Sequence, residues 1–295
     1  MAIIWFEKTI AGWLLSFFTF ALFHLLSFSF PVLTLFHRDL GGDGLPPLVL
    51  LHGMLGSSRN WQTTGADLAK EHHVMALDLR NHGRSPHADE MTYDAMLADV
   101  LGWLDAQALQ RASFLGHSMG GKLAMQLACR HPERVDRLIV VDIAPKTYFS
   151  AAHRAEFAAM NELDLRTLRT RAEAEMKLES RVSDWAMRKF LTTNLEREAG
   201  EKADWKWIVN LPVLTENLPN LEKLPLRSDD SYRGPTLFLT GEKSRYVQPE
   251  DRTAILHHFP SARIETIVEA GHNPHMETRG EFVRIVTEFF QSAEN

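Results

Sequence analysis

Cysteine is almost absent from this sequence, since Cys129 is the single one among 295 residues. One thiol cannot form an internal disulfide, and no second cysteine stands near it to complete a zinc cluster. We therefore expect neither a disulfide framework nor a metal site. The expected role of Cys129 is to fill space in the core.

Runs of basic residues are also missing. The formal net charge is -6, and the lysines and arginines are spread along the chain. Proteins that bind nucleic acids present a basic patch or stripe, so we exclude a nucleic-acid partner. The 45% of hydrophobic and 24% of charged residues are typical of a folded globular domain, and the chain is long enough for one large core or two small ones.

Charge is missing altogether between Thr9 and His37. As a helix, the apolar residues 9–30 would span about 33 Å, enough to cross a bilayer core. A cleaved signal peptide is disfavoured, because no small-x-small site follows the apolar run. We predict an apolar N-terminal helix within residues 1–32 that associates with a membrane. A helix lying on a membrane surface, or an extension without a functional role, would fit the same residues, so the location stays open between cytoplasmic and membrane-associated.

After this segment, short apolar runs alternate with amphipathic helical patterns. This rhythm predicts an α/β fold, with a mostly parallel central sheet and helices on both faces. The first two runs are separated by the turn-rich sequence LGGDGLP, which predicts a hairpin. The expected strands are residues 33–39, 47–53, 73–78, 112–116, 137–142, 235–241 and 262–268.

One long interval interrupts the alternation. Residues 146–234 contain three helical patterns and no clear strand. A structureless loop of that length would be uncommon in a compact domain. We predict a helical cap over the strand ends, inserted before the penultimate strand, and a core formed by residues 33–145 and 235–295.

The sequence FLGHSMGGKLAM contains the pattern Gly-x-Ser-x-Gly around Ser118, between an expected strand and an expected helix. A reversal this tight needs glycines two residues before and two residues after the serine, and it pushes the serine out of the end of the sheet. The serine also lies at a helix N-terminus, which favours negative charge. We predict that Ser118 is a nucleophile.

A nucleophilic serine needs a base, and fourteen histidines are available. His272 follows the last expected strand and comes after the serine in the chain, as a hydrolase of this topology requires. We predict His272 as the base, with His275 as the alternative. Three histidines on other loops are expected to be turn or pocket-wall residues: His52, His82 and His117.

A third motif lies at the end of the strand expected at residues 47–53. There His52 and Gly53 begin a loop that would aim the Met54 N–H at the same point as the Met119 N–H. Two such donors make an oxyanion hole, which lowers the barrier of an acyl transfer by a few kcal/mol.

Together these motifs resemble the α/β-hydrolase family from about Leu33 to Phe290. LHGMLGSSRNW, DLRNHGRS, GHSMGGKLA, VVDIAP and AGHNPHME stand in the family's order. DLRNHGRS combined with VDIAPKTY is more specific and looks like the YbfF-type serine esterases and their animal relatives. The resemblance implies a serine esterase that acts on acyl esters or thioesters with modest acyl chains under a helical cap. The N-terminal apolar segment is not part of this pattern.

The acidic residue expected to complete a Ser-His-acid triad departs from the family scheme. The family scheme expects it three residues past Gly241, where this sequence has Ser244. A serine can accept a hydrogen bond from imidazole but cannot supply the charge that stabilises imidazolium. Asp142 ends the strand next to the nucleophile strand, and the resembling esterases carry an Asp in the same motif. We predict Asp142 as the acid and Ser244 as an auxiliary partner. Glu242 remains the alternative acid, and Asp142 could instead cap the turn that follows it.

Two further acidic residues are expected to be structural. Asp78 ends the strand at residues 73–78 and should hold the following loop through Arg80. Asp99 lies inside a helical pattern.

Apolar residues near these loops predict an acyl pocket. Leu55 and Trp61 come from the core, beside Met54 and Met119, and Phe149 and Trp185 come from the cap. Packing within the cap would explain the last two as well.

The combined prediction is a serine carboxylesterase that hydrolyses small acyl esters of short to medium chain length through an acyl-enzyme. It needs no metal and no organic cofactor. An acyl-thioesterase, a lipase-like hydrolase and a non-catalytic binding protein of the same fold are the alternatives. A serine at position 118 argues against the dehalogenases and epoxide hydrolases, which use an aspartate nucleophile.

Overall fold

The computed structural model describes residues 31–198 and 204–292. The chain divides into two units, Met1–Pro31 and Val32–Asn295, and the account below concerns the second. The predicted N-terminal helix and its membrane association fall on residues 1–30, outside the described residues. Within the described part of the chain, no helix is both long enough and apolar enough to cross a membrane.

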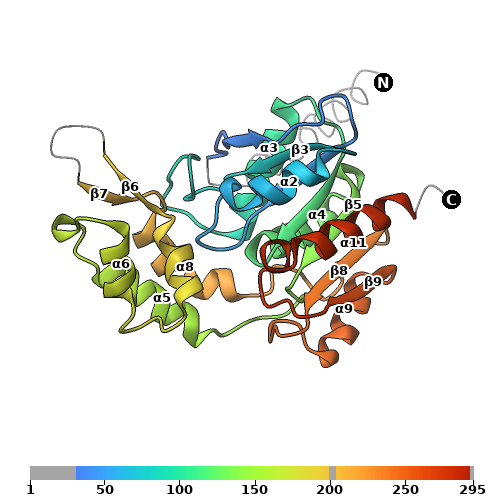
Figure 1. Cartoon of the computed structure of the whole chain (residues 1–295). Helices are drawn as coiled ribbons and strands as arrows, with labels where there is room; N and C mark the ends of the chain where they lie inside the picture. Colours follow the sequence, from blue (N-terminus) through green and yellow to red (C-terminus); the bar gives the residue numbers. More distant parts are fainter. Residues whose placement is uncertain (1–30, 199–203, 293–295) are drawn as a thin grey trace, which may run out of the picture. The chain divides into compact units, whose positions relative to one another are not determined.

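A central sheet of seven strands runs in the order β1-β3-β2-β4-β5-β8-β9 (Figure 1). All neighbouring strands are parallel except β1, which is antiparallel to β3. The predicted α/β class with a mostly parallel sheet is confirmed. The strands are β1 His37–Asp39, β2 Pro47–Leu51, β3 His73–Leu77, β4 Ala112–His117, β5 Val135–Val141, β8 Thr236–Gly241 and β9 Ala262–Ile267.

The predicted hairpin between the first two strands is wrong. β1 pairs with β3, and β2 lies between β3 and β4. The connecting segment folds around the start of β3, where the Leu40 N–H donates to the Val74 carbonyl and the Val74 N–H donates to the Gly41 carbonyl. Gly41 and Gly42 both have positive φ angles, which a glycine adopts without strain. A glycine-rich turn therefore bends this chain past one strand to the next.

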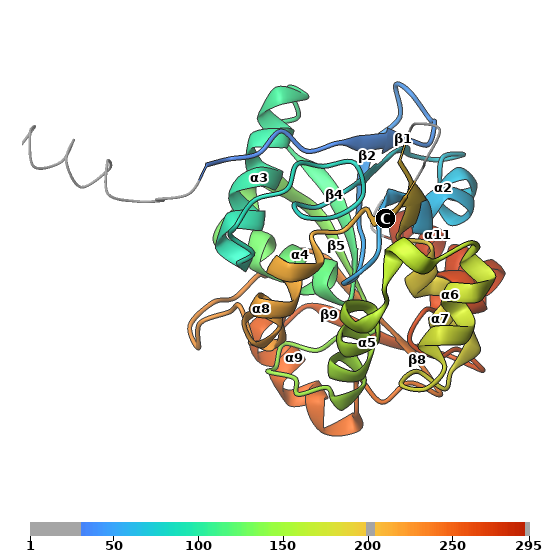
Figure 2. The ribbon, with the colours of Figure 1, turned by 90° about the vertical axis from the view of Figure 1, so that its left-hand side faces the viewer.

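Alternate residues of each strand face opposite sides of the sheet, and each side has its own core. Val49 and Leu51 of β2 belong to one hydrophobic cluster, and Leu48 and Leu50 belong to the other. The first cluster packs against α3 (Tyr93–Ala106), α4 (Met119–Arg130) and α9 (Arg252–His258). The second packs against α2 (Gln62–Leu68) and α11 (Arg279–Gln291). Figure 2 shows the same elements from the side.

Between β5 and β8 lies a largely helical segment, residues 146–234, called the cap segment below. Its helices are α5 Ala151–Glu162, α6 Arg171–Leu178, α7 Trp185–Thr192 and α8 Leu211–Glu222. Ser150, Thr170 and Asp184 accept hydrogen bonds from the first turns of α5, α6 and α7, which is why these helices begin there. The segment also contains a short antiparallel pair, β6 Leu195–Arg197 and β7 Trp205–Trp207. Strands of three residues carry too little alternation to be found by pattern, and the sequence prediction missed them.

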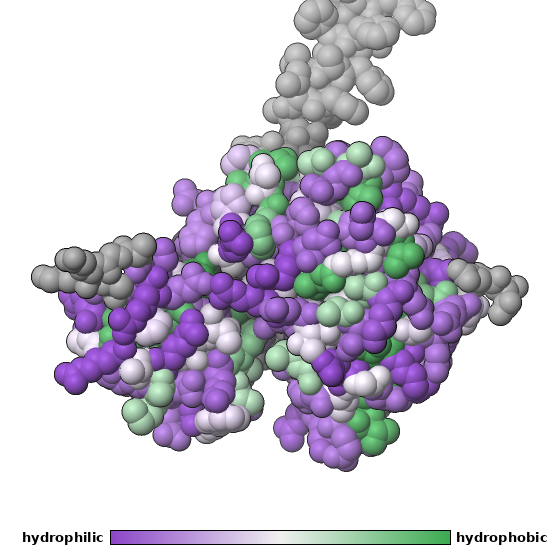
Figure 3. Space-filling view, turned by 45° about the horizontal axis from the view of Figure 1, so that its top comes forward, coloured by the Kyte–Doolittle hydropathy of each residue, from purple (hydrophilic) through white to green (hydrophobic). Residues whose placement is uncertain are grey.

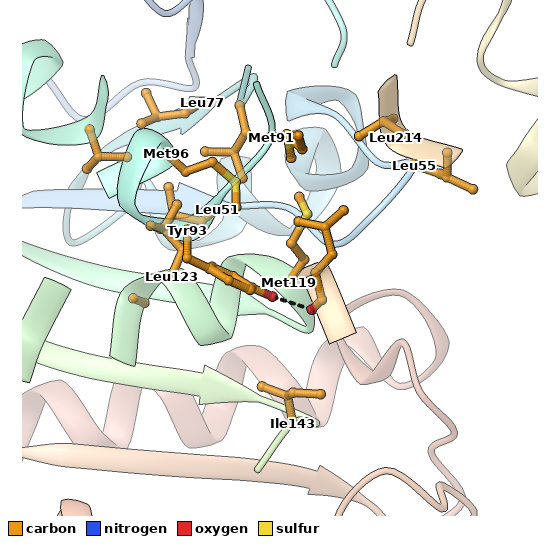
Figure 4. Packing of buried hydrophobic residues seen from close by; sticks show 14 of the residues in the cluster. Leu51, Leu55, Leu77, Met91, Tyr93, Met96, Met119, Leu123, Ile143 and Leu214 are labelled. Carbon is orange, nitrogen blue, oxygen red and sulfur yellow. Dashed lines mark hydrogen bonds between the residues drawn. The ribbon is translucent and has the colours of Figure 1, made fainter. Parts of the chain in front are cut away.

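The core continues from the sheet into the cap segment. Figure 4 shows Leu51, Met119 and Leu123 in the same packed region as Leu214 of α8. The buried Tyr93 of α3 donates its hydroxyl hydrogen to the Leu221 carbonyl of α8 over 2.9 Å. Hydrophobic packing and this buried hydrogen bond therefore join α8 to the helix layer beside β4.

Candidate active site

Ser118 occupies a strained turn between β4 and α4. Its φ and ψ angles are 51° and -114°, a conformation that is costly for a residue with a side chain. A Cβ on Gly116 would lie 2.3 Å from the Gly120 carbonyl oxygen, and a Cβ on Gly120 would lie 2.5 Å from the Leu51 carbonyl oxygen. Both glycines are therefore required by close backbone approach, which agrees with the spacing argument. The turn places Ser118 at the carboxyl end of the sheet, where it is 9% exposed and lines a cavity.

Asp142 and His272 lie together at the same end of the sheet. The His272 Nδ1 atom is 2.7 Å from the Asp142 Oδ2 atom. Asp142 directly follows β5, the neighbour of β4, which ends beside Ser118, and His272 lies on the loop after β9. The structure thus brings an acid from β5, rather than one from the loop after β8, to the histidine.

The Asp142 carboxylate is completely buried and has three hydrogen-bond donors. The Gly241 N–H donates to Oδ1 over 3.0 Å, and Oδ2 receives the Ser244 hydroxyl as well as His272. Gly241 is the last residue of β8, and Ser244 lies on the loop that follows it. Because a buried carboxylate is costly unless it is hydrogen-bonded, these donors explain how a negative charge is held here without water.

Glu242 faces a different partner. Its carboxylate accepts a hydrogen bond from the Glu269 N–H over 2.9 Å, on the turn that follows β9, and the residue is exposed. No hydrogen bond joins it to His272 within the described residues. Glu242 therefore joins the two loops that follow β8 and β9.

Two further contacts hold His272, one to its ring and one to its backbone carbonyl. The Tyr246 ring stacks on it with centroids 3.7 Å apart and planes at 13°. His117 Nε2 donates to the His272 carbonyl over 2.8 Å. Burial first, and then the neighbouring His272 and His275, hold the pKa of His117 well below its ordinary value, so this ring is neutral. Stacking and the backbone contact fix both the ring and its loop.

The loop after β2 runs directly beside Ser118. A Cβ on Gly53 would lie 3.3 Å from the Ser118 Cβ atom, so the main chain before Met54 passes close to the serine. Met119 is the first residue of α4, where helix N–H groups have no acceptor within the helix. This arrangement suits the predicted pair of oxyanion donors.

Two buried histidines support that loop. The Leu55 N–H donates to His82 Nε2 over 3.2 Å, and the Leu79 N–H donates to His52 Nε2 over 3.0 Å. Burial lowers the pKa of both rings, for His82 to about 3, so both accept these hydrogen bonds as neutral imidazoles. Their position agrees with the structural role that the sequence indicates.

His275 lies against a different group. Its ring is buried and packs on Trp61, with centroids 4.3 Å apart, and burial lowers its pKa to about 3. Asp142 contacts His272 instead. Of these two histidines, it is therefore His272 that is hydrogen-bonded to the buried aspartate.

Ser118 and His272 open into one cavity of about 250 Å³. Leu55 and Trp61 line it, as expected, and α5 and α7 of the cap segment contribute His153, Glu156, Met187 and Phe190. In Figure 3 the surface has a notch between the part that carries the cap segment and the core. The cavity therefore has walls from both parts of the chain.

The expectation for Phe149 and Trp185 is wrong. Neither lines the cavity, and they are 81% and 58% exposed. The Arg154 guanidinium lies over the Phe149 ring and the Lys189 ammonium lies over the Trp185 ring, on the outer surface. In α7 it is Ala186, Met187 and Phe190 that face inward. Sequence pattern identifies apolar residues but not which side of a cap helix meets the cavity.

The partner of Arg80 also differs from the prediction. Its guanidinium forms two hydrogen bonds with Asp99, of 2.7 and 2.9 Å, and both side chains are completely buried. Asp78 instead accepts from the Ser58 and Arg84 N–H groups. The aspartate inside the helix is therefore the charge partner, because α3 packs that side chain under the loop.

Charged residues around the cavity are of one sign. Among residues 31–198 and 204–292, its lining includes the carboxylates of Glu156, Asp184 and Glu277 and no lysine or arginine. Among residues 31–198 and 204–292, no group of three or more His, Cys, Asp or Glu side chains is arranged to hold a metal ion. The polar groups of the cavity are thus hydrogen-bonding groups and carboxylates.

Sequence reasoning did not find three of the polar residues at this site: Tyr246, His153 and Glu156. Tyr246 follows Ser244 by two residues, so its place after a strand end was a usable signal. His153 and Glu156 are three residues apart on α5 and therefore share one helix face. Which face meets the cavity depends on how the cap segment packs, and no local pattern gives that.

The chain is similar to known proteins over most of its length. Residues 46–278 match the family model described as alpha/beta hydrolase fold. The sn-1-specific diacylglycerol lipase ABHD11 of Xenopus laevis is 39% identical, covering 84% of this chain and 80% of that protein. Esterase YbfF of Escherichia coli is 35% identical, covering 82% and 92%. The solved structure of a marine microorganism esterase is 37% identical with a TM-score of 0.83, covering 87% and 99%.

Proposed function

The chain belongs to the α/β-hydrolase family, among its carboxylic ester hydrolases, and we propose that it is a serine carboxylesterase that cleaves short to medium acyl esters. One observation carries the proposal. Ser118, on its strained turn, opens into the same cavity as His272, and the Nδ1 atom of His272 is hydrogen-bonded to the buried Asp142. These are the parts of a nucleophile, a base and an orienting acid.

In the proposed first step, the Ser118 oxygen attacks the ester carbonyl carbon while His272 Nε2 takes the serine proton. The tetrahedral intermediate collapses, the C–O bond to the alcohol breaks, and His272 returns the proton to the leaving alcohol. Water then attacks the acyl-enzyme in the same way and releases the carboxylic acid. The close approach of the loop after β2 to Ser118 supports Met54 and Met119 N–H groups as the oxyanion donors.

Asp142 has the role of holding His272 in the productive tautomer and of stabilising the imidazolium that forms. Its burial supports this role, because a charge interacts more strongly where water is excluded. Ser244 has the role of holding the Asp142 carboxylate in place.

The volume of the cavity limits the size of the acyl group. At about 250 Å³ it lies near the lower limit for small-molecule sites, which supports short to medium acyl chains. We also propose that the cap segment, residues 146–234, closes over the bound ester, since α5 and α7 form part of the cavity wall. A lipase activity is the second candidate, because relatives at 39% identity are named diacylglycerol lipases.

The test is labelling with a fluorophosphonate probe, which reacts with activated serines. The full-length protein should be labelled and should hydrolyse a short p-nitrophenyl ester, and Ser118→Ala should do neither. Ser113→Ala is the matched control, because Ser113 is a buried serine on the same strand β4. A folded wild-type protein that is neither labelled nor active would contradict the enzyme assignment and favour a binding protein.

A panel of acyl esters and thioesters with two to sixteen carbons would then decide between the candidates. A maximum of kcat/KM at short or medium esters supports the carboxylesterase. A maximum at long-chain glycerides would favour the lipase, and a maximum at thioesters would favour the thioesterase.

We retain membrane association through residues 9–30 as a separate proposal. Fractionation of cells that express the full chain or a version beginning at Leu33 tests it. Loss of the membrane-bound fraction in the shorter chain is the expected result, and equal fractions would contradict it.

A further inference from the structure

One carboxyl group in the cavity has no role in the proposed mechanism. Glu156 lies on α5 and is only 8% exposed, yet it lines the same cavity as Ser118 and His272. It shares its helix face with His153, which also lines the cavity and bonds to the Tyr246 hydroxyl over 3.0 Å. Glu156 therefore belongs to a polar wall, formed by the cap segment, that faces the catalytic residues.

The side chain of Glu156 has no hydrogen-bond or ion-pair partner among the described residues. The other two carboxylates of the lining do have partners. Asp184 accepts from the Ala186 and Met187 N–H groups, and Glu277 accepts from the Gly271 and Asn273 N–H groups. The carboxylate oxygens of Glu156 are not fully enclosed by protein, so water can be their partner in the cavity before a substrate binds. A substrate that displaces this water must supply a hydrogen bond in its place, since a buried polar group without a partner costs free energy.

The charges around Glu156 restrict what that molecule can be. Burial, and then the negative charge of Asp184, raise the pKa of Glu156 to about 7. Because the described part of the lining has carboxylates and no lysine or arginine, an anionic group beside Glu156 would be repelled. A neutral hydroxyl can donate to the ionised carboxylate and can accept from the protonated one, so it fits both states near neutral pH.

We propose that Glu156 is a specificity-determining residue that binds a hydroxyl group of the substrate. The preferred substrates are then uncharged acyl esters that keep a free hydroxyl close to the ester bond. This inference rests on the proposed esterase function and adds to it the chemical class of the substrate.

Matched esters test the proposal with the full-length protein. The substrates are 2-hydroxyethyl butanoate and its methyl ether, 2-methoxyethyl butanoate, which differ only in the donor hydrogen and one methyl group. A third substrate, the 2-(trimethylammonio)ethyl ester, carries a positive charge without a donor. The readout is the ratio of kcat/KM between esters, measured for wild type, Glu156→Met and Glu156→Gln.

The wild type should prefer the hydroxyl ester to the methyl ether. Glu156→Met should reduce that preference by roughly 10- to 100-fold, the size expected for a hydrogen bond to a charged group. Glu156→Gln should keep part of the preference, because an amide still bonds to a hydroxyl. Glu216→Met, which changes an exposed carboxylate of α8, should keep the wild-type ratio.

Three results would overturn the proposal. They are equal kcat/KM for the hydroxyl ester and its methyl ether in wild type, an unchanged ratio in Glu156→Met, and a Glu156-dependent preference for the ammonium ester over the hydroxyl ester. Circular dichroism confirms that each variant is folded. If wild type cleaves none of these esters and is not labelled by fluorophosphonate, it is the esterase function that fails, so the two failures are distinguishable.

Discussion

Ser244 donates its hydroxyl hydrogen to the carboxylate of Asp142. The two residues follow neighbouring parallel strands, β8 and β5, and meet at the carboxyl edge of the sheet. The position where the family scheme expects an acid therefore holds a group that supports an acid on the next strand. The absence of a carboxylate at position 244 is thus compatible with a complete set of triad residues.

The stacked ring of Tyr246 predicts a contribution to the reaction rate. A parallel aromatic ring at 3.7 Å holds the imidazole plane and attracts the imidazolium that forms in the proposed transition state. Tyr246→Leu should lower kcat on a short ester by roughly 3- to 30-fold, corresponding to about 0.5–2 kcal/mol. Tyr246→Phe keeps the ring and loses the contacts of the hydroxyl with His153 and Ser150, so it should stay closer to wild type. Equal kcat values for the two variants would contradict a contribution of ring stacking to the reaction rate.

The buried pair of Arg80 and Asp99 predicts a large effect on stability. Asp99→Asn removes the negative charge that lies beside the buried guanidinium, which should reduce the free energy of unfolding by about 3–5 kcal/mol. Asp105→Asn is the control, since Asp105 is 68% exposed in its pair with Arg134 and should cost about 1 kcal/mol or less. Urea unfolding measures both. Similar losses of unfolding free energy in the two variants would show that burial does not increase the contribution of the Arg80 pair to stability.

Glu156 predicts a pH-dependent stability. Its pKa in the folded protein is about 7, above the ordinary value of 4.5, so between these values the folded state binds the proton more tightly than the unfolded state. Stability therefore falls as pH rises from 4.5 through 7, by about 3 kcal/mol at most. Glu156→Gln should raise Tm at pH 8 and change it little at pH 5. Thermal unfolding at both values, with Glu216→Gln as control, tests this, and the same shift at both pH values would contradict it.

The sequence predicted those features that depend on local pattern. Ser118 could be placed on its turn because close backbone approach demands Gly116 and Gly120, and Asp142 because it ends an apolar strand. Pairings set by packing could not be predicted. The Arg80 charge was assigned to Asp78, the nearer residue in sequence, whereas α3 brings Asp99 to it.

The same limit applies to the cap segment. Its helices were visible as amphipathic patterns, but their orientation depends on packing against the core. Apolar character therefore pointed to Phe149 and Trp185, which lie outside, while the inward polar residue Glu156 went unnoticed. A hydrophobic pattern shows that a helix has a buried side but does not show what that side meets.

The most direct test of the account compares kcat of Asp142→Asn and Ser244→Ala on one short ester. Asp142→Asn removes the charge beside His272 and keeps the size of the side chain, so a loss on the order of 10⁴ is expected, as for this change in other Ser-His-Asp triads. Ser244→Ala removes one of three donors to a carboxylate that remains charged, so a loss of roughly 10-fold or less is expected. If Ser244→Ala lost as much activity as Asp142→Asn, or if Asp142→Asn were nearly as active as wild type, the assignment of the catalytic charge to Asp142 would be contradicted.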